Sequence, residues 1–324
     1  MNVIDDKAAS AKKERYSRLG FNLVRLLSWP LAWLPPALGL AFGAFMGRLA
    51  FRLSARRRRI AIANIEMIKK NGALPPDLEA ETTARESFAN FGRAAWETIV
   101  FFHRGLDVLL PWCQVEEGRE YLREALDESR KIGRAVMMVT GHMGNWELMC
   151  QYLARNFGYK MHVIGRDSGN PTVDGLIRKL RTAEGNAYIP KTGGAMAMVS
   201  ALKSGGVLGT LIDQAVIADS SGLSLPFLGR EATTNVGPVR LAHRTGAPIV
   251  MVLFRREGRR NFVKICPALP PRPDMSRDEA VLADARQLND WLSEHIQRYP
   301  DQWMWGHRRW KTREGVHQDA ESIT

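Results

Sequence analysis

Beyond residue 134, the hydrophobic positions form short apolar runs that alternate with amphipathic stretches. A run of about five apolar residues is typical of a buried strand, whereas apolar residues repeated every three or four positions indicate a helix. The strand-like runs are 135–140, 161–165, 207–212, 249–254 and 262–266. The helical stretches are 146–157, 172–184, 193–203, 236–244 and 278–299. This alternation predicts an α/β fold, an αβα sandwich with helices on both faces of a sheet.

The first third of the chain has a different pattern. Apolar residues recur at helical spacing between residues 56 and 102, and the stretch before them contains 22 consecutive positions without a charge. These changes divide the chain into a basic N-terminal segment at 1–25, a hydrophobic segment at 26–47 and a large domain at 48–324. Within the large domain we expect a helical lead-in at 48–130 and an α/β core at 131–311.

The hydrophobic segment at 26–47 is long enough to span a bilayer, since about 20 apolar residues suffice. Three prolines, Pro30, Pro35 and Pro36, would bend it and free backbone carbonyls in hydrocarbon. Basic clusters flank it on both sides, which suits a bent membrane element whose two ends stay on the cytoplasmic face. A buried hairpin of a soluble protein and a cleaved signal peptide are the alternatives.

Charge and cysteine content narrow the class of protein. The formal net charge is +12, which favours an anionic partner such as a nucleic acid, a membrane surface or a phosphorylated substrate. The three cysteines are scattered and odd in number. They argue against a disulfide framework or a structural zinc site and fit a reducing compartment.

The candidate chemistry centres on residues 135–149, which read as strand, Gly-x-x-Gly turn and helix, with Asn145 as the N-cap. On one continuous helix His142 and Glu147 would lie about 140° apart. If His142 lies in the turn instead, Glu147 can reach back to its ring nitrogen. An imidazole oriented in this way at the carboxyl end of a strand suits a general base. The alternative is a structural histidine tied to a nearby carboxylate.

Other polar residues follow strand-like runs and should lie on the same rim of the sheet. Arg166 and Asn170 follow the run at 161–165, Arg181 lies in the next helix, and Asp213-Gln214 follows the run at 207–212. Arginines at such a rim suit the bidentate capture of phosphate. The alternatives are surface ion pairs for the arginines and an Asx turn for Asp213.

Signatures of several other site classes are absent from the sequence. It contains no P-loop, G-x-G-x-x-G, G-x-S-x-G or H-E-x-x-H pattern, so nucleotide, dinucleotide, serine-esterase and zincin sites lack their motifs. The Gly141–Gly144 turn does match the four-residue clamp of KH domains. A pattern this short is common by chance, so it does not favour RNA binding.

Six motifs together carry a family resemblance. The spacing His142-(x)4-Glu147 after an apolar strand resembles membrane glycerolipid acyltransferases. The full set, from about Leu23 to Lys311, resembles the lipid A biosynthesis (lauroyl/myristoyl) acyltransferase family. The other blocks are Gly144-Asn145-Trp146-Glu147, Arg166-x-x-x-Asn170, Asp213-Gln214, Pro226-Phe227-x-Gly229 and Gln302-Trp303-x-Trp305-x-His307-Arg308-Arg309-Trp310. Many members carry Asp in place of Glu147 and some carry Arg-Pro in place of Arg166-Asp167, which leaves acyl length and acceptor open.

The resemblance implies an αβα sandwich of the glycerolipid-acyltransferase type. It implies transfer of an acyl chain from acyl carrier protein to a hydroxyl of a phosphorylated lipid A precursor, on the cytoplasmic face of the inner membrane. It implies no metal and no organic cofactor beyond the donor thioester. His142 and Glu147 would be the catalytic residues. The expected substrate-binding residues are Gly144, Asn145, Arg166, Asn170, Arg181, Asp213 and Gln214.

The chemistry read from the residues agrees with this expectation. Acyl transfer to a hydroxyl needs a base, for which His142 is the candidate, and donors for an oxyanion, for which the backbone N–H groups at 144–146 are candidates. A lipid acceptor would account for the apolar segment and the Trp-rich tail. The competing hypotheses are acylation of another glycolipid or lysophospholipid, a basic nucleic-acid-binding protein, and a membrane adaptor with a purely structural His142.

Overall fold

The computed structural model describes residues 20–165, 169–190, 193–216 and 222–310. Within these residues, a seven-stranded sheet has the order β1-β9-β8-β2-β5-β3-β4, and all neighbours are parallel except β8 and β9. A separate antiparallel hairpin comprises β6 and β7. The strands are β1 (Cys113–Glu117), β2 (Val136–Thr140), β3 (Met161–Gly165), β4 (Ala187–Pro190), β5 (Val207–Leu211), β6 (Gly222–Phe227), β7 (Arg230–Asn235), β8 (Ile249–Glu257) and β9 (Arg260–Ile265).

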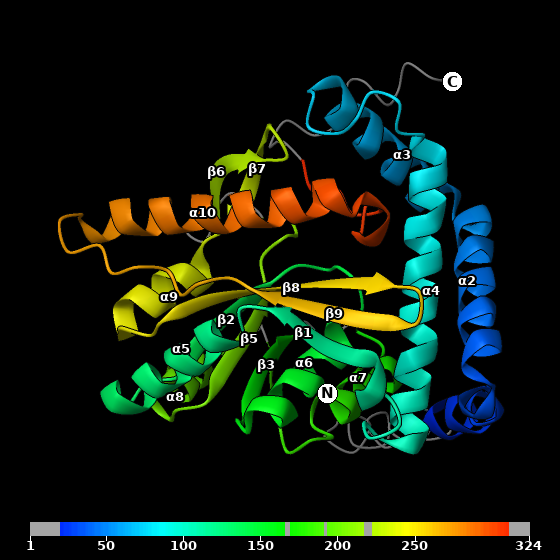
Figure 1. Ribbon diagram of the computed structural model, residues 1–324, viewed down its shortest axis with the longest axis horizontal. Helices are drawn as coiled ribbons and strands as arrows, with labels where there is room; N and C mark the ends of the chain where they lie inside the picture. Colours follow the sequence, from blue (N-terminus) through cyan, green and yellow to red (C-terminus); the bar gives the residue numbers. More distant parts are fainter. Residues whose placement is uncertain (1–19, 166–168, 191–192, 217–221, 311–324) are drawn as a thin grey trace, which may run out of the picture.

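Helices cover both faces of this sheet, which confirms the α/β prediction (Figure 1). Alternate residues of β2 point to opposite faces: Met137 and Val139 pack in one apolar cluster, Val136 and Met138 in the other. The first cluster includes side chains of α8 (Ala195–Lys203), α9 (Gly237–Thr245) and α10 (Arg277–Arg298). The second includes side chains of α5 (Arg119–Ile132) and α6 (Trp146–Phe157). A further helix, α7 (Pro171–Arg181), follows β3.

All five strands expected from the sequence are present, but the sheet begins earlier than residue 131. Strand β1 pairs in parallel with β9, so residues 113–117 belong to the sheet rather than to a helical lead-in. This strand is short and only Val115 in it is buried, so its hydrophobic pattern is weak. The same applies to β4, of which one residue is buried.

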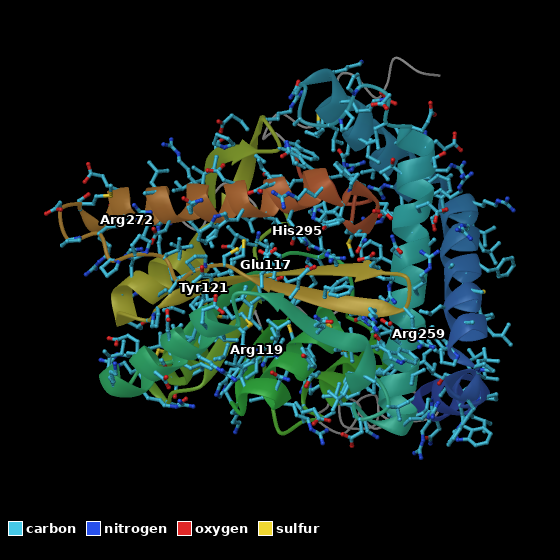
Figure 2. The ribbon with its side chains drawn as sticks, viewed as in Figure 1. Glu117, Arg119, Tyr121, Arg259, Arg272 and His295 are labelled. Atoms are coloured by element: carbon cyan, nitrogen blue, oxygen red, sulfur yellow. The ribbon has the colours of Figure 1, made fainter. Side chains whose placement is uncertain are left out.

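Helix α10 shows the apolar stripe that the sequence predicts. It begins at a capping box formed by Ser276 and Glu279 and buries Leu288, Leu292 and Ile296. His295 lies on the same side, between α10 and the sheet, where its Nε2 lies 3.2 Å from the Phe254 carbonyl oxygen (Figure 2). Burial lowers the pKa of His295 to about 4, so this ring is neutral at pH 7.

The N-terminal third forms a helical arm beside the sheet (Figure 1). Residues 20–28 are helical, and η1 (Pro30–Trp33), α2 (Pro36–Leu53), α3 (Ala55–Lys70) and α4 (Ala80–Arg104) follow. The hydrophobic segment at 26–47 is therefore broken at Pro30 and again at Pro35, as the prolines predict. In the part of the chain that the structure describes, no single helix has the length and apolarity to cross a membrane. Helices α2 and α3, bent by 95°, pass that test only as a pair.

Helix α2 packs against α4 through glycines. Gly39, Gly43 and Gly47 repeat every four residues and face α4, where Gly92 lies opposite. A Cβ on Gly43 would lie 2.5 Å from the Gly92 carbonyl oxygen, and a Cβ on Gly92 would overlap the Gly43 carbonyl. The two backbones are therefore in direct contact, an approach that only glycine permits.

The Trp-rich tail is part of the core, and this corrects the expectation that it serves the lipid acceptor. Trp303, Trp305 and Trp310 are 1%, 0% and 6% exposed and belong to the cluster on the α10 face. Arg309 is fully buried and donates to the Thr233 carbonyl and the Thr234 hydroxyl of β7. The tail therefore joins the β6–β7 hairpin to the rest of the domain.

Candidate active site

The turn after β2 carries the candidate base. Strand β2 ends at Thr140, and α6 begins at Trp146 with Asn145 as its N-cap, as predicted. Gly144 has φ +55°, and a Cβ on it would lie 3.2 Å from the Phe254 backbone. A side chain at this position would be strained and crowded, so the glycine is what allows the turn to place His142 beyond the strand.

His142 is oriented by Asp213. The Nδ1 atom of His142 lies 2.7 Å from Asp213 Oδ1, and its backbone N–H donates to Asp213 Oδ2 at 2.8 Å. This pairing follows from the strand register. Thr140 of β2 lies opposite Leu211 of β5, and His142 and Asp213 each lie two residues further along parallel neighbours.

Asp213 is ionised at neutral pH although its side chain is only 1% exposed. Burial raises its pKa, but the charge of His142 and hydrogen bonds from His142 and Trp303 lower it further, to about 2. An ionised carboxylate only accepts hydrogen bonds, so His142 Nδ1 carries the proton. In the neutral ring Nε2 is therefore the basic nitrogen.

The side-chain amide of Gln214 forms a hydrogen bond with that nitrogen. Its Nε2 lies 3.2 Å from His142 Nε2 and donates to the lone pair of the neutral ring. The His142 side chain is 17% exposed, so the ring remains accessible at its edge. The predicted rim residues Asp213 and Gln214 thus both meet His142, one at each ring nitrogen.

Glu147 does not orient His142, and this part of the prediction is wrong. Its carboxylate forms a bidentate ion pair with Arg181 of α7, with Nε–Oε2 and Nη2–Oε1 distances of 3.0 and 2.5 Å. Gly165 at the end of β3 leaves room for this guanidinium, because a Cβ there would overlap Arg181 Nη1. Glu147 and Arg181 were expected to act separately, on His142 and on substrate, but they neutralise each other.

The Asn145 side chain is buried and hydrogen-bonded within the protein, so it is not exposed to substrate. It is 2% exposed, its Oδ1 accepts from the Leu148 N–H, and its Nδ2 donates to Glu97 Oε2 at 2.8 Å. Glu97 is itself fully buried on α4 and also binds Arg256 and Asn261. The Asn145 side chain therefore ties the catalytic turn to the helical arm, and substrate would meet only its backbone.

The remaining predicted substrate-binding residues are Gly144, Arg166 and Asn170. Asn170 is the N-cap of α7 and accepts from the Thr172 and Val173 N–H groups. Arg166 lies outside the described residues, so its predicted role stays a prediction. The N–H of Gly144 is bonded at 3.3 Å to the Gln302 carbonyl.

The backbone N–H groups at the start of α6 are candidate donors to a substrate. No hydrogen bond joins the N–H groups of Asn145, Trp146 or Glu147 to another residue in the described ranges. The first N–H groups of a helix have no partner within the helix, and the helix N-terminus also carries a partial positive charge. The Trp146 ring packs edge-on against His142, with centroids 5.0 Å apart, so these donors and the base share one small region.

The tail completes the site, which the sequence did not indicate. Met143 forms an isolated antiparallel bridge with Trp303, and the Trp303 indole N–H donates to Asp213 Oδ2 at 2.8 Å. His307 is also close enough to Asp213 and His142 for their charges to act on it, and burial lowers its pKa. The motif spacing contains no periodic signal that would place residue 303 beside residue 213.

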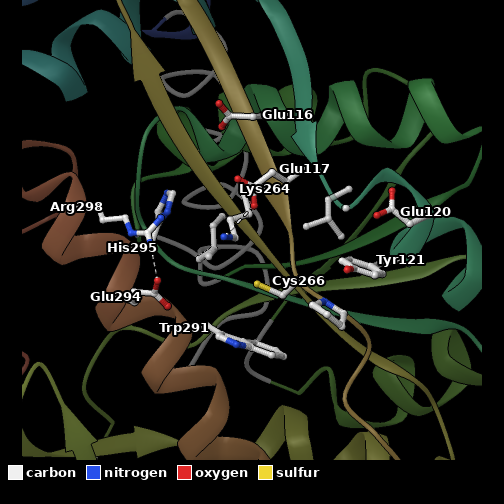
Figure 3. Close-up of a pocket in the computed structure, with 14 residues that line it drawn as sticks. Glu116, Glu117, Glu120, Tyr121, Lys264, Cys266, Trp291, Glu294, His295 and Arg298 are labelled. Atoms are coloured by element: carbon white, nitrogen blue, oxygen red, sulfur yellow. Dashed lines mark hydrogen bonds and ion pairs between the residues drawn. The ribbon is translucent and has the colours of Figure 1, made fainter.

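A hollow of about 570 Å³ lies elsewhere, on β1 and β9 beneath α10 (Figure 3). None of the predicted site residues lines it. Its acidic side chains are largely paired, with Glu117 bound to Lys264 and Glu294 to Arg298. These are surface-type ion pairs, and the hollow is separate from the His142 region.

Known proteins resemble this chain over most of its length. The family described as bacterial lipid A biosynthesis acyltransferase matches residues 8–312. The lipid A biosynthesis lauroyltransferase of Escherichia coli (strain K12) is 28% identical over 291 residues, 89% of this chain and 90% of the relative. The lipid A biosynthesis palmitoleoyltransferase of the same strain is 27% identical over 311 residues, 92% of each chain. A phosphatidylinositol mannoside acyltransferase of Mycolicibacterium smegmatis is 26% identical over 237 residues, 71% of each chain.

Proposed function

Because the chain belongs to the bacterial lipid A biosynthesis acyltransferase family, we propose that it transfers a fatty acyl chain from an acyl-carrier-protein thioester to a hydroxyl of a lipid A precursor. Membership of the family makes the chain an acyltransferase of lipid A biosynthesis. The identities of the acyl donor and of the exact acceptor are what we propose. One observation carries the mechanism: the ionised Asp213 carboxylate binds His142 at Nδ1, which leaves Nε2 as the basic nitrogen of the ring.

In the proposed reaction the acceptor hydroxyl takes the place of the Gln214 amide at His142 Nε2. The imidazole removes the hydroxyl proton as the oxygen attacks the thioester carbonyl carbon, and Asp213 stabilises the imidazolium. The negative charge on the carbonyl oxygen is met by N–H groups of Asn145 and Trp146. Collapse of the tetrahedral intermediate breaks the carbon–sulfur bond, and the imidazolium returns the proton to the leaving thiolate.

Glu147 and Arg181 have a positioning role in this proposal. Glu147 lies in the first turn of α6, and its ion pair with Arg181 fixes α6 relative to α7. Since the two charges compensate each other, Arg181 is not a free cation for a phosphate in this arrangement. Anionic groups of a phosphorylated acceptor would be met by other cations of this basic chain, and Arg166 and Gln214 stay predicted substrate contacts.

The proposal needs no metal, no organic cofactor and no nucleic acid. A base, oxyanion donors and a donor already activated as a thioester supply every step of acyl transfer to a hydroxyl. The partners are acyl carrier protein, a phosphorylated glycolipid and membrane lipids.

We propose that the protein lies on the cytoplasmic face of the inner membrane, and the exposed apolar side chains of the helical arm support docking on a membrane. Of the fourteen large hydrophobic side chains that are exposed in the described chain, ten lie between residues 23 and 53. On α2, Leu38 and Phe45 are each 60% exposed and lie seven residues apart, on one face, while the glycines face α4. Arginines of α2 and α3 flank this surface. An apolar face bordered by cations suits partial insertion among anionic headgroups.

The double change Leu38→Glu and Phe45→Glu should weaken binding to anionic lipid vesicles at least roughly ten-fold, since burying one such side chain contributes about 1.5–3 kcal/mol. Vesicle co-sedimentation in buffer of fixed salt measures this. Ile132→Glu with Met275→Glu is the matched control, because these exposed side chains lie on the α/β core. Equal loss in both pairs, or no loss in either, would contradict docking through α2.

A second acceptor class has specific support. The mycobacterial relative is named for a phosphatidylinositol mannoside, which is a different glycolipid. The function is tested by incubating the purified protein with an acyl-carrier-protein thioester (acyl-ACP) and one of two acceptors. The acceptors are a bis-phosphorylated lipid A precursor and a phosphatidylinositol mannoside. Mass spectrometry should show the gain of one acyl ester on the lipid A precursor. Acylation of only the mannoside would favour the second class, and acylation of neither would refute the proposal.

A further inference from the structure

We propose that Trp303 is a positioning residue of the reaction: its indole N–H fixes the Asp213 carboxylate in the orientation at which that carboxylate holds His142. The catalytic role of Trp303 in this inference rests on the proposed function. The arrangement of the three side chains itself does not depend on the identity of the substrates.

Among the described residues, three donors bind the Asp213 carboxylate. Oδ1 accepts from His142 Nδ1, and Oδ2 accepts from both the His142 backbone N–H and the Trp303 indole N–H. The two bonds from His142 come from the same turn. The bond from Trp303 is the one anchored on a distant segment, so it prevents the carboxylate from rotating together with a movement of the turn.

Trp303 is held rigidly enough for this task. It is 1% exposed. Its ring packs edge-on against Trp305, with centroids 4.7 Å apart, and at a tilt against Phe227, with centroids 5.5 Å apart. The hydroxyl of Ser87 on α4 donates to its carbonyl oxygen at 2.5 Å. Its backbone also pairs with Met143 next to the base. The tail and the catalytic turn therefore form one bonded unit.

The charges around Asp213 give the bond an electrostatic consequence. Within the described residues, the titratable and cationic groups that interact with its charge include His142, His307 and Arg309. Losing the Trp303 N–H removes a donor that stabilises the carboxylate, so the pKa of Asp213 rises. A more basic carboxylate binds the imidazolium more strongly, and the ring then takes up its proton at higher pH.

The kinetic test compares Trp303→Phe with Trp305→Phe. Both changes remove a buried indole N–H and a similar volume, but the Trp305 indole donates to the Pro300 carbonyl instead. Trp303→Phe should lower kcat at pH 7 roughly 10- to 100-fold, the range expected for a hydrogen bond to a charged group. The acidic limb of its pH–rate profile should move to higher pH. Trp305→Phe should leave that limb in place.

A second measurement uses the unaltered protein and needs neither activity nor a folded variant. In ¹⁵N spectra of the indole groups, the Trp303 N–H signal should shift as the His142 ring is titrated, because the two share one carboxylate. The Trp305 signal should not follow that titration. A Trp303 signal insensitive to His142 protonation would overturn the inference, as would identical pH profiles for the two phenylalanine variants.

These outcomes separate the inference from the proposed function. If no acyl transfer is detected with the wild-type protein but the Trp303 signal follows His142, the positioning role stands and the assigned reaction fails. If acyl transfer is normal and the Trp303 signal does not follow His142, the reaction stands and the positioning role fails.

Discussion

Replacing His142 with alanine is expected to lower the rate of acyl transfer about 10²–10⁴-fold, the usual contribution of a general base. The variant should fold normally, because the ring is partly exposed at the rim and its loss leaves only Asp213 and Gln214 without one partner each. Steady-state kinetics with acyl-ACP and the lipid A precursor measure the loss, and circular dichroism checks the fold.

A matched control exists in the same chain. His243 on α9 also contacts a buried aspartate: its Nε2 lies 2.8 Å from Oδ2 of Asp284 on α10, which is bound to Arg272 as well. His243→Ala removes a histidine from a buried aspartate without touching the site, so turnover should be close to that of the wild type. Near-normal turnover of the His142 variant, or an equal loss in both, would remove His142 from the mechanism.

Replacing Asp213 with asparagine should have the second large effect, a loss of about 10³–10⁴-fold. In Ser-His-Asp enzymes the equivalent change costs about 10⁴-fold, because the amide selects the wrong tautomer of the ring. Here Oδ1 accepts from His142 Nδ1, and an amide nitrogen in that place would reverse the bond. Glu147→Gln should be milder than Asp213→Asn. The reverse ranking would restore Glu147 as the partner of His142.

The pH dependence follows from the pKa of Asp213, which is lowered to about 2 in the folded protein. The ordinary value is about 3.9, so this carboxylate contributes stability that is fully present above pH 4 and lost as the pH falls toward 2. Asp213→Asn should remove that acid-sensitive part of the unfolding free energy. Because the carboxylate stays ionised above pH 4, the catalytic defect should persist at every pH at which the enzyme works.

The sequence predicted elements better than it predicted contacts between them. Strands β2, β3, β5, β8 and β9 are short apolar runs, and helices α6 to α10 have apolar residues at helical spacing. Both patterns depend only on local burial. The partner of His142 depends on which strands are neighbours. Nothing in the local spacing indicates that β2 lies beside β5, and this adjacency is what places Asp213, rather than Glu147, against the ring.

The tail was misread for a related reason. Trp303 and Trp305 lie between Pro300 and a run of cations without an amphipathic period, and such a segment suggests an exposed surface. In the structure, side chains of α3 and α4 bind its carbonyl oxygens: Asn64 binds those of Trp305 and His307, and Ser87 binds that of Trp303. Burial of the tail is thus decided by helices more than two hundred residues away in the chain.

The glycine contact between α2 and α4 bears on how this enzyme is best prepared for study. Shortening the chain from its N-terminal end to gain solubility would uncover the face of α4 at Gly92 and Trp96, where the α2 backbone now lies. An exposed backbone groove beside a large aromatic ring promotes aggregation. Polar replacements at Leu38 and Phe45 keep α2 in place and change only its outer face. A detergent-free preparation is therefore better sought by redesigning that outer face than by truncation.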